Sequence, residues 1–318
     1  MHNVLLTGST GFVGREVSKR LASTSDFELV LAGRELTVHL PVNVPFHELG
    51  QLDSSTDWSQ ALLARDVVIH SAARVHVMHD TSTDPLAEFR RVNVEGTLNL
   101  ARQAAAAGVK RFIFISSIKV NGEGTTLGKP YTAFDTPAPQ DPYGVSKLEA
   151  EQGLRQIADD TGMEVVIIRP VLVYGPGVKA NFRSMMNWVN KGVPLPLGAI
   201  HNRRSLVSLD NLVDLIITCI DHPAAANQTF LVSDGEDLST SQMLRRMAAA
   251  LGQPARLLPV PERWLCAAAG MLGKAAVAQR LCGSLQVDIR HTCETLDWQP
   301  PVSVDDGFRR TAHAFLNE

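Results

Sequence analysis

A tyrosine and a lysine four residues apart form the pair with the clearest chemistry in the chain. Tyr143 and Lys147 share one face of a helix predicted to begin near Pro142. A phenol with a pKa of about 10 is a weak base at neutral pH, but a nearby ammonium favours the phenolate and allows proton exchange with a carbinol or carbonyl oxygen. Such pairs also occur on solvated helices. Ser117, at the end of the apolar run RFIFISS, adds a hydroxyl for the same oxygen and favours a catalytic reading.

A glycine-rich turn lies near the N-terminus, between a strand-length run and a helix-length run. Its spacing is GxxGxxG, in the sequence GSTGFVG. A dinucleotide needs a tight turn, a backbone free of side chains at the pyrophosphate, and the free amides of a helix N-terminus. A turn that only packs helix on strand is the alternative. We expect the cofactor to contact Gly8, Thr10, Gly11, Phe12, Val13 and Gly14.

The end of the second strand bears on which dinucleotide binds. The sequence there is LAGRE, which places Arg34 where a carboxylate would bind the ribose hydroxyls of NAD. A guanidinium suits the 2′-phosphate of NADP, so NADP is the preferred cofactor and NAD is the alternative. Arg34 could instead be a solvated loop charge, because Glu35 follows and could reach the ribose.

Alternating strand and helix patterns must position these residues. Strand-length apolar runs occur at 3–6, 28–32, 66–70, 111–115 and 164–168, and helix-length stretches at 12–21, 58–63, 85–107 and 143–158. This alternation predicts an α/β fold with a doubly wound parallel sheet, the Rossmann type. We expect a cofactor-binding domain over 1–170 and a smaller, interleaved substrate lobe over 171–318, with helices around 182–190, 210–221, 240–251 and 262–282.

Composition narrows the class of protein further. A net charge of −3 produces no positive electrostatic potential that would attract nucleic acid. The N-terminus has no secretory pattern and no apolar run is long enough to cross a bilayer, so we expect a cytoplasmic protein without stable membrane insertion. The apolar segment 264–281 is interrupted by Lys274 and Arg280, which favours core packing. Four cysteines show no metal-ligand spacing, so no metal site is expected.

Several motifs together resemble one known family. TGSTGFVG, HSAA, RVNVEGT, ISS and YGVSK look like the extended short-chain dehydrogenase/reductases, which include nucleotide-sugar epimerases, dehydratases and 4-ketoreductases. The resemblance implies that Ser117, Tyr143 and Lys147 are the catalytic residues and that a nucleotide sugar is the substrate. It further implies cofactor contacts at Ala72, Ala73, Lys147 and Pro170, and substrate contacts at Ser117, Asn181, Phe182 and Arg204.

The resemblance leaves several reactions to choose between. The family's dehydratases carry an Asp and a Glu after the catalytic Ser or Thr, whereas this chain has Ile118 and Lys119, which disfavours elimination. Arg34 and the segments SAARVHVM and ISSIKVNGEGT favour an enzyme similar to the bacterial reductases of UDP-4-keto-6-deoxy-N-acetylhexosamines in O-antigen synthesis. A UDP-hexose or UDP-N-acetylhexosamine 4-epimerase with bound NAD is the alternative. A nonenzymatic NADP sensor is the alternative of another class.

The same family implies a mode of self-association. Relatives often form dimers through two long helices, which here would span about 85–107 and 141–160. Alanines 101 and 104–107 would allow close helix packing, but they would serve an internal core equally well. A homodimer is therefore possible, and the sequence does not decide it.

Overall fold

The computed structural model describes residues 1–37, 40–75, 84–273 and 275–318. Its main sheet has seven strands in the order β3-β2-β1-β4-β5-β6-β9, all parallel. The strands are β1 (His2–Thr7), β2 (Phe27–Gly33), β3 (Phe46–Glu48), β4 (Val67–His70), β5 (Arg111–Ile115), β6 (Glu164–Pro170) and β9 (Thr229–Val232). The predicted doubly wound Rossmann sheet is confirmed.

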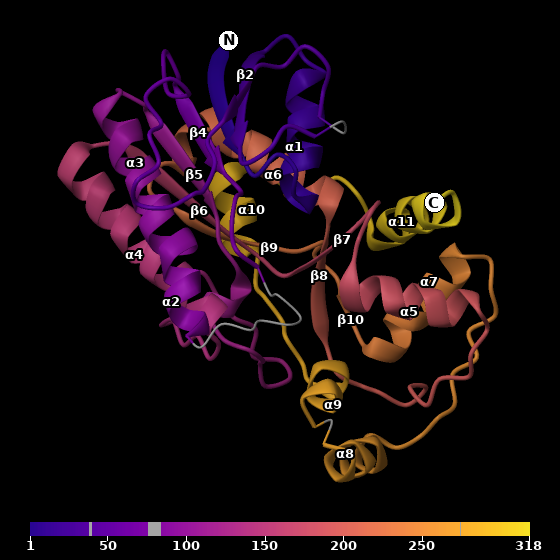
Figure 1. Cartoon of the computed structure of the whole chain (residues 1–318). Coiled ribbons are helices and arrows are strands. Elements are labelled where there is room, and N and C mark those ends of the chain that lie inside the picture. Colours follow the sequence, from indigo (N-terminus) through magenta and orange to yellow (C-terminus); the bar gives the residue numbers. More distant parts are fainter. Residues whose placement is uncertain (38–39, 76–83, 274) are drawn as a thin grey trace.

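Helices cover both faces of this sheet (Figure 1). One face packs on α1 (Phe12–Ala22) and α6 (Leu209–Asp221), and the other on α3 (Thr97–Ala106) and α4 (Pro142–Thr161). Alternate strand residues go to opposite faces, as the pleat requires: Leu6 faces α1 and α6, whereas Leu5 faces α3 and α4. The sheet is therefore buried on both sides, which explains why its strands read as continuous apolar runs.

The strand order reverses between β1 and β4, and this reversal places the binding crevice. The chain winds one way through β1, β2 and β3 and then returns to β4 on the other side of β1. In open α/β sheets, ligands bind at such a switch point, outside the carboxyl ends of the strands. The glycine turn follows β1, and Ala72 and Ala73 follow β4, so both meet at this edge.

The second lobe contains a small sheet and most of the remaining helices. The sheet has the order β10-β8-β7, with strands β7 (Leu172–Tyr174), β8 (Arg204–Ser208) and β10 (Asp237–Leu238). Its helices are α5 (Ala180–Asn190), α7 (Thr240–Ala250), α8 (Glu262–Met271), α9 (Ala275–Cys282) and α11 (Val304–Leu316). Strand β9 and helix α10 (Arg290–Leu296), although also late in the chain, return to the main sheet. The two lobes are thus interleaved along the sequence.

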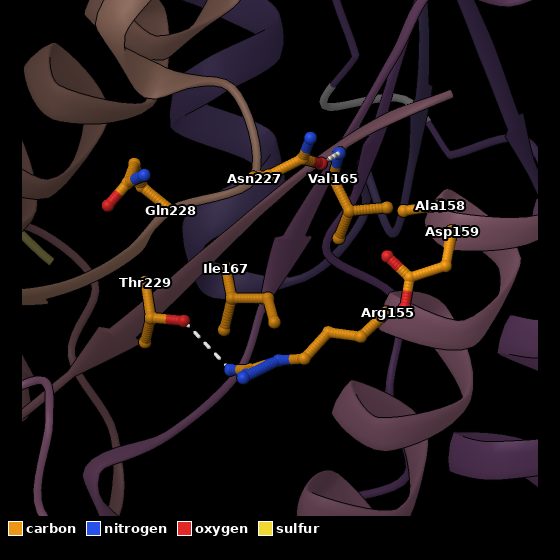
Figure 2. Close-up of a pocket in the computed structure, with 8 residues that line it drawn as sticks. All are labelled: Arg155, Ala158, Asp159, Val165, Ile167, Asn227, Gln228 and Thr229. Carbon is orange, nitrogen blue, oxygen red and sulfur yellow. Dashed lines mark hydrogen bonds between the residues drawn. The ribbon is translucent and has the colours of Figure 1, made fainter. Parts of the chain in front are cut away.

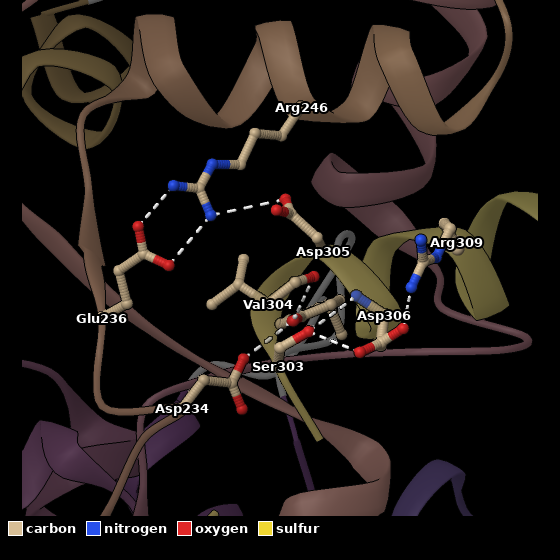
Figure 3. A network of polar contacts seen from close by, with 9 residues as sticks. Asp234, Glu236, Arg246, Ser303, Val304, Asp305, Asp306 and Arg309 are labelled. Atoms are coloured by element: carbon tan, nitrogen blue, oxygen red, sulfur yellow. Dashed lines mark hydrogen bonds and ion pairs between the residues drawn. The ribbon is translucent and has the colours of Figure 1, made fainter.

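Polar contacts connect the parts of the second lobe (Figure 3). Arg246 of α7 binds Glu236 before β10 and lies 3.4 Å from a carboxylate oxygen of Asp305 in α11. Tyr174 at the end of β7 donates a hydrogen bond of 2.7 Å to Asp234, which follows β9. The contact between Tyr174 and Asp234 also joins the small sheet to the loop leaving the main sheet.

Three sequence predictions about helices need correction. Residues 58–63 form turns rather than a helix, although Trp58, Ala61 and Leu62 are buried and still cover the sheet. The helix predicted at 262–282 is divided by Gly273, which has a φ of +66°, into α8 and α9. The core packing expected for 264–281 is incomplete in α8, which has no fully buried residue and packs on the second-lobe core only through the half-buried Leu265. Apolar spacing predicted a helix there but not a partner to cover it.

The helices expected at 85–107 and 141–160 are present, although the first of them is irregular. It consists of α2 (Pro85–Arg90), a π-helical segment (Arg91–Gly96) and α3. Helices α3 and α4 pack against each other. The homodimer that the family resemblance implied stays a prediction.

Candidate active site

The glycine turn packs against the segment that follows β4 without space for side chains. A Cβ added to Gly8 would lie 2.5 Å from the amide nitrogen of Ala72, and one added to Gly14 would lie 2.2 Å from the carbonyl oxygen of Gly8. Gly8 also has a φ of +74°, which non-glycine residues rarely adopt. The close packing holds the start of α1 at the switch point of the sheet.

The start of α1 has the free polar groups that a pyrophosphate needs. Its N-cap residue, Gly11, has no side chain to bond the first amides of the helix. Thr10 and Gly11 are exposed, and Phe12 and Val13 are half-buried. The buried Ser9 hydroxyl has no hydrogen-bond partner in the described part of the chain. These residues fit the diphosphate of a dinucleotide.

The other expected cofactor residues lie at the carboxyl edge of the sheet. Ala72 and Ala73 are half-buried after β4, and Pro170 is the buried last residue of β6. Arg34 is exposed directly after β2, and its guanidinium forms no ion pair with any residue that the structure describes. Their contacts with a cofactor stay predictions.

Helix α4 brings the two catalytic candidates to the end of β5. Asp141 caps the helix by accepting a 2.7 Å hydrogen bond from the amide of Gly144. One turn later, the Lys147 ammonium donates a 2.8 Å hydrogen bond to the carbonyl of Ile115, the last residue of β5. Ser117 is two residues beyond Ile115 and is partly exposed. The structure therefore joins the Tyr143–Lys147 helix to the strand end that carries Ser117.

Burial shifts the protonation of both residues toward the neutral form. It lowers the pKa of Lys147 to about 7, against the opposite effect of Glu151. It also raises the pKa of Tyr143 well above its usual value, and the negative charge of Asp141 adds to this. The Lys147 ammonium lies 4.4 Å from the centre of the Phe114 ring, which stabilises its charged form. In the free protein, burial therefore favours the protonated phenol of Tyr143.

A buried polar network behind Ser117 was missed by the sequence analysis. Arg169 of β6 forms a 2.5 Å ion pair with Glu151 of α4, and both side chains are at most 3% exposed. Glu151 also accepts a 2.5 Å hydrogen bond from Ser116, and Arg169 donates one of 2.9 Å to Asn121. The network ties α4, β6 and the loop around Ser117 together. No local pattern indicates it, because its members are far apart in the sequence.

Asn93 is a second positioning residue without an assigned role in the sequence analysis. It lies in the π-helical segment and is 1% exposed. Its side chain accepts a 2.8 Å hydrogen bond from the Arg74 amide and donates bonds of 3.0 Å to the Arg74 carbonyl and the Ser146 hydroxyl. Asn93 thus connects the segment after β4 to the helix of Tyr143. Asn93 belongs to the motif RVNVEGT, which contributed to the family resemblance. This motif was the only feature of the sequence analysis that could have pointed to a role for Asn93.

Lys119 forms ion pairs with two carboxylates. It stands at the position where the family's dehydratases carry a carboxylate. Its ammonium binds Asp141 and lies 3.0 Å from a Glu123 carboxylate oxygen. Burial lowers its pKa, but the hydrogen bonds with Asp141 and Glu123 outweigh that effect and raise the pKa overall. Lys119 therefore stays charged at neutral pH and is not a general base, which agrees with the argument against elimination.

The expected substrate residues are in different environments. Asn181 is exposed at the start of α5. Phe182 is 2% exposed and stacks on Tyr174 with ring centres 5.4 Å apart, so its side chain belongs to the core of the second lobe. Arg204 donates hydrogen bonds of 3.1 and 3.0 Å to the carbonyls of Arg280 and Gly283. Substrate contacts of Asn181, Phe182 and Arg204 stay predictions; in this structure the Phe182 side chain packs in the core of the second lobe.

Two cysteines and a glutamate come together on α8 and α9. The ligand atoms of Glu262, Cys266 and Cys282 lie within 4.8 Å of one another on α8 and α9. Sequence spacing gave no sign of this group. Three side chains are one fewer than a structural zinc site uses, and two of the three are exposed, so the group carries no metal assignment.

A pocket of about 200 Å³ lies at the opposite edge of the main sheet (Figure 2). It is lined by residues near the start of β6 and β9, including Val165 and Thr229, and by Arg155 of α4. The Arg155 guanidinium donates a 2.9 Å hydrogen bond to the Thr229 hydroxyl. Since Ser117, Pro170 and the glycine turn lie at the carboxyl ends of the strands, this pocket is not the candidate active site.

The Rossmann fold, with a glycine turn and Ser117 at the carboxyl edge of its sheet and Tyr143 and Lys147 on α4, is typical of dinucleotide-binding α/β proteins. Comparison with known proteins is more specific. The model of the NAD dependent epimerase/dehydratase family matches residues 4–233, and the chain belongs to that family.

Individual relatives and solved structures agree with this family. The chain is 56% identical to the UDP-glucose 4-epimerase of Vibrio cholerae over 99% of this chain and 95% of that one. It is 29% identical to the N-acetyl-α-D-glucosaminyl-diphospho-ditrans,octacis-undecaprenol 4-epimerase of Escherichia coli O157:H7, with 85% and 77% covered. The UDP-glucose 4-epimerase of Thermotoga maritima, solved with UDP-glucose, has a similar fold, with a TM-score of 0.77, 21% identity and 99% of both chains covered.

These comparisons correct the reaction expected from the sequence. The predicted reduction of a UDP-4-keto-6-deoxy-N-acetylhexosamine is wrong, because the 56% identical relative is named a 4-epimerase. The segments SAARVHVM and ISSIKVNGEGT, of which residues 76–78 lie outside the described residues, gave the wrong indication.

Proposed function

We propose that the protein is a UDP-hexose 4-epimerase that works with bound NAD. The observation that carries the proposal is the 56% identity, over nearly the whole chain, to a protein named UDP-glucose 4-epimerase. Three further features support it: a glycine turn without space for side chains, Lys147 bonded to the end of β5 on the helix that also carries Tyr143, and Ser117 two residues beyond that strand. Inversion at a carbinol carbon needs a group that removes and returns one proton, and Tyr143 is that group.

The proposed roles of the side chains follow from their environments. The glycine turn and Lys147 would hold the cofactor, which when bound accepts a hydride and returns it. Tyr143 takes the proton of the sugar 4-hydroxyl and later gives it back, while Ser117 holds the same oxygen through a hydrogen bond. A protonated Lys147 favours the phenolate of Tyr143. Asn93 and the Glu151–Arg169 pair keep α4 and the Ser117 loop in position.

The test is turnover of UDP-glucose by the purified protein with NAD and no external reductant. We expect UDP-galactose to form until the two sugars reach equilibrium, without net change in nicotinamide absorbance. Tyr143→Phe should abolish this turnover. Stoichiometric oxidation of NADPH by a 4-keto sugar, with no epimer formed from any UDP-hexose, would contradict the proposal.

The preference between NAD and NADP is a separate part of the proposal. The family description and the named epimerase favour NAD. The exposed Arg34 favours NADP by charge, and this prediction stays open to test. Titration with each cofactor, followed by nicotinamide fluorescence and repeated with Arg34→Glu, separates them. NADPH binding that is tighter than NADH binding in the wild type, and not in the variant, would refute the NAD assignment.

A second candidate substrate is a sugar linked through a diphosphate to a polyprenol. Its support is the name of the Escherichia coli relative, together with an apolar helix, α8, that has no buried residue. Parallel assays with UDP-N-acetylglucosamine and with undecaprenyl-diphospho-N-acetylglucosamine in detergent distinguish the carriers. Turnover of the lipid-linked sugar alone would favour this second candidate.

A further inference from the structure

The α8–α9 hairpin presents large apolar side chains to solvent. Trp264 is 64% exposed, Met271 84%, Leu272 72% and Val277 51%. The hairpin lies at the far end of the second lobe, away from the main sheet (Figure 1). Scattered exposed apolar residues are common on soluble proteins, but a group on one short segment marks an interaction surface.

These side chains lie along one outward face of α8. Trp264, Ala268 and Met271 follow the spacing of successive helical turns and are all exposed. On the other side, Leu265 and Ala269 are half-buried, and Leu265 packs against the core of the second lobe. On α9 the buried residues Ala278 and Cys282, one turn apart, face that lobe. The hairpin is therefore attached by one face, and the other has no covering element among the described residues.

The charge of the hairpin is opposite to that of the whole protein. Residues 262–282 contain three basic residues and one acidic residue, a net charge of +2, whereas the chain as a whole carries −3. The guanidinium groups of Arg263 and Arg280 form no ion pair with any residue that the structure describes. An apolar stripe with unpaired basic groups beside it is the pattern of a helix that lies in an anionic lipid interface.

We propose that the α8–α9 hairpin docks the protein on a membrane surface containing anionic lipids. Trp264 and Met271 enter the boundary between headgroups and acyl chains, and Arg263 and Arg280 contact the headgroup phosphates. None of the described helices is long and apolar enough to span a bilayer, so the contact is peripheral. A second copy of the chain fits this surface less well, because symmetric pairing would bring two positive hairpins together.

The position of the hairpin relates the docking surface to the second lobe. Arg204 of β8 donates hydrogen bonds to the carbonyls of Arg280 and Gly283, at the end of α9. The hairpin is thus held against the small sheet and is not connected to the lobe by a flexible linker alone. Docking through it would place this side of the second lobe against the lipid surface. The inference does not depend on which sugar carrier the active site takes.

Vesicle flotation tests the docking surface. The full-length protein is mixed with vesicles of phosphatidylcholine alone or with about a third of phosphatidylglycerol, at low and high salt. We expect binding only to the anionic vesicles, weakened by salt. Arg263→Gln with Arg280→Gln should reduce the association constant about 25-fold, about fivefold for each charge lost. Trp264→Ser with Met271→Ser should reduce it on the order of tenfold.

A matched control removes apolar side chains of similar exposure elsewhere. Val42 and Leu63 are 86% and 61% exposed on the first domain, and Val42→Ser with Leu63→Ser should bind anionic vesicles like the wild type. Sugar turnover and circular dichroism of every variant should match the wild type, because none of these residues lies in the site or the core.

Three results would overturn the proposal. The first is failure of the wild-type protein to float with anionic vesicles. The second is equal binding by the wild type and by both hairpin variants. The third is conversion of a dimer to a monomer by Trp264→Ser with Met271→Ser while vesicle binding is unchanged, which would identify the hairpin as a contact between two copies of the chain.

Discussion

Replacement of the buried Lys147 should make the cofactor-free protein more stable. Lys147 is 2% exposed, and burial lowers its pKa from 10.5 to about 7. Folding at neutral pH therefore works against the preference of this amine to be charged. Lys147→Met fills a similar volume without a charge. We expect the variant to lose turnover and to gain free energy of unfolding at pH 7 and below.

The magnitude follows from the shift of the pKa. A pKa lowered from 10.5 to about 7 corresponds to about 5 kcal/mol at a pH below both values. The variant also loses the 2.8 Å hydrogen bond from Lys147 to the Ile115 carbonyl. A bond of this charged type contributes about 1.5–3 kcal/mol, so the net gain is about 2–3 kcal/mol.

The pH dependence provides the sharper check. Between pH 7 and 10.5 the unfolded chain keeps a proton on Lys147 that the folded protein has released, so the wild type becomes more stable as the pH rises. The advantage of Lys147→Met should therefore shrink by about 1.4 kcal/mol per pH unit above 7. Urea unfolding of both proteins at several pH values measures it.

Lys147→Arg is the control, since it keeps a cation at the same position and should gain no stability. A difference in unfolding free energy that stays constant from pH 6 to 10 would refute the reasoning. So would a Lys147→Met variant less stable than the wild type at every pH. Either result would mean that the buried ammonium is not an unfavourable element of the fold.

Three further predictions concern the cofactor turn and the groups that position the site. Tyr143→Phe should leave cofactor binding within about twofold of wild type while epimerisation is lost, because the ring remains and only the proton carrier is removed; loss of binding would contradict this role. Gly14→Ala places a methyl 2.2 Å from the Gly8 carbonyl oxygen, so calorimetry should show cofactor binding weakened at least tenfold. Gly108→Ala is the control, because this glycine lies away from the turn and its replacement should change stability but not cofactor binding. Glu151→Gln leaves the Arg169 charge buried without its partner and should lower the unfolding free energy by about 3–5 kcal/mol; an unchanged urea midpoint would exclude a structural role for the pair.

Part of the fold and site could be predicted because the signals are local. A glycine turn between a strand and a helix specifies the phosphate site through backbone geometry that a few neighbouring residues determine. Tyr143 and Lys147 share a helix face by their spacing alone. The parallel sheet followed from apolar runs that alternate with helical stretches. Residues 58–63 were misread because a short apolar stretch can cover a sheet as turns as well as a helix does.

The reaction is a different matter, since neither the motifs nor the fold decide it. Reductases and epimerases share the residues that hold the cofactor and the reacting oxygen, and Arg34 led the prediction toward NADP and reduction. The high identity to a named epimerase corrected that prediction. Fold and motif alone do not determine which reaction a site performs.

By itself, the sequence determined the sheet, the cofactor turn and the helix that carries Tyr143 and Lys147. Only the tertiary structure decided that Glu151 pairs with Arg169, that Asn93 connects two distant segments, and that α8 is left uncovered. The physical reason is the range of the interactions. Periodicity and turn chemistry act within a few residues, whereas an ion pair, a hydrogen bond between segments or the burial of a helix face depends on what folding brings beside it.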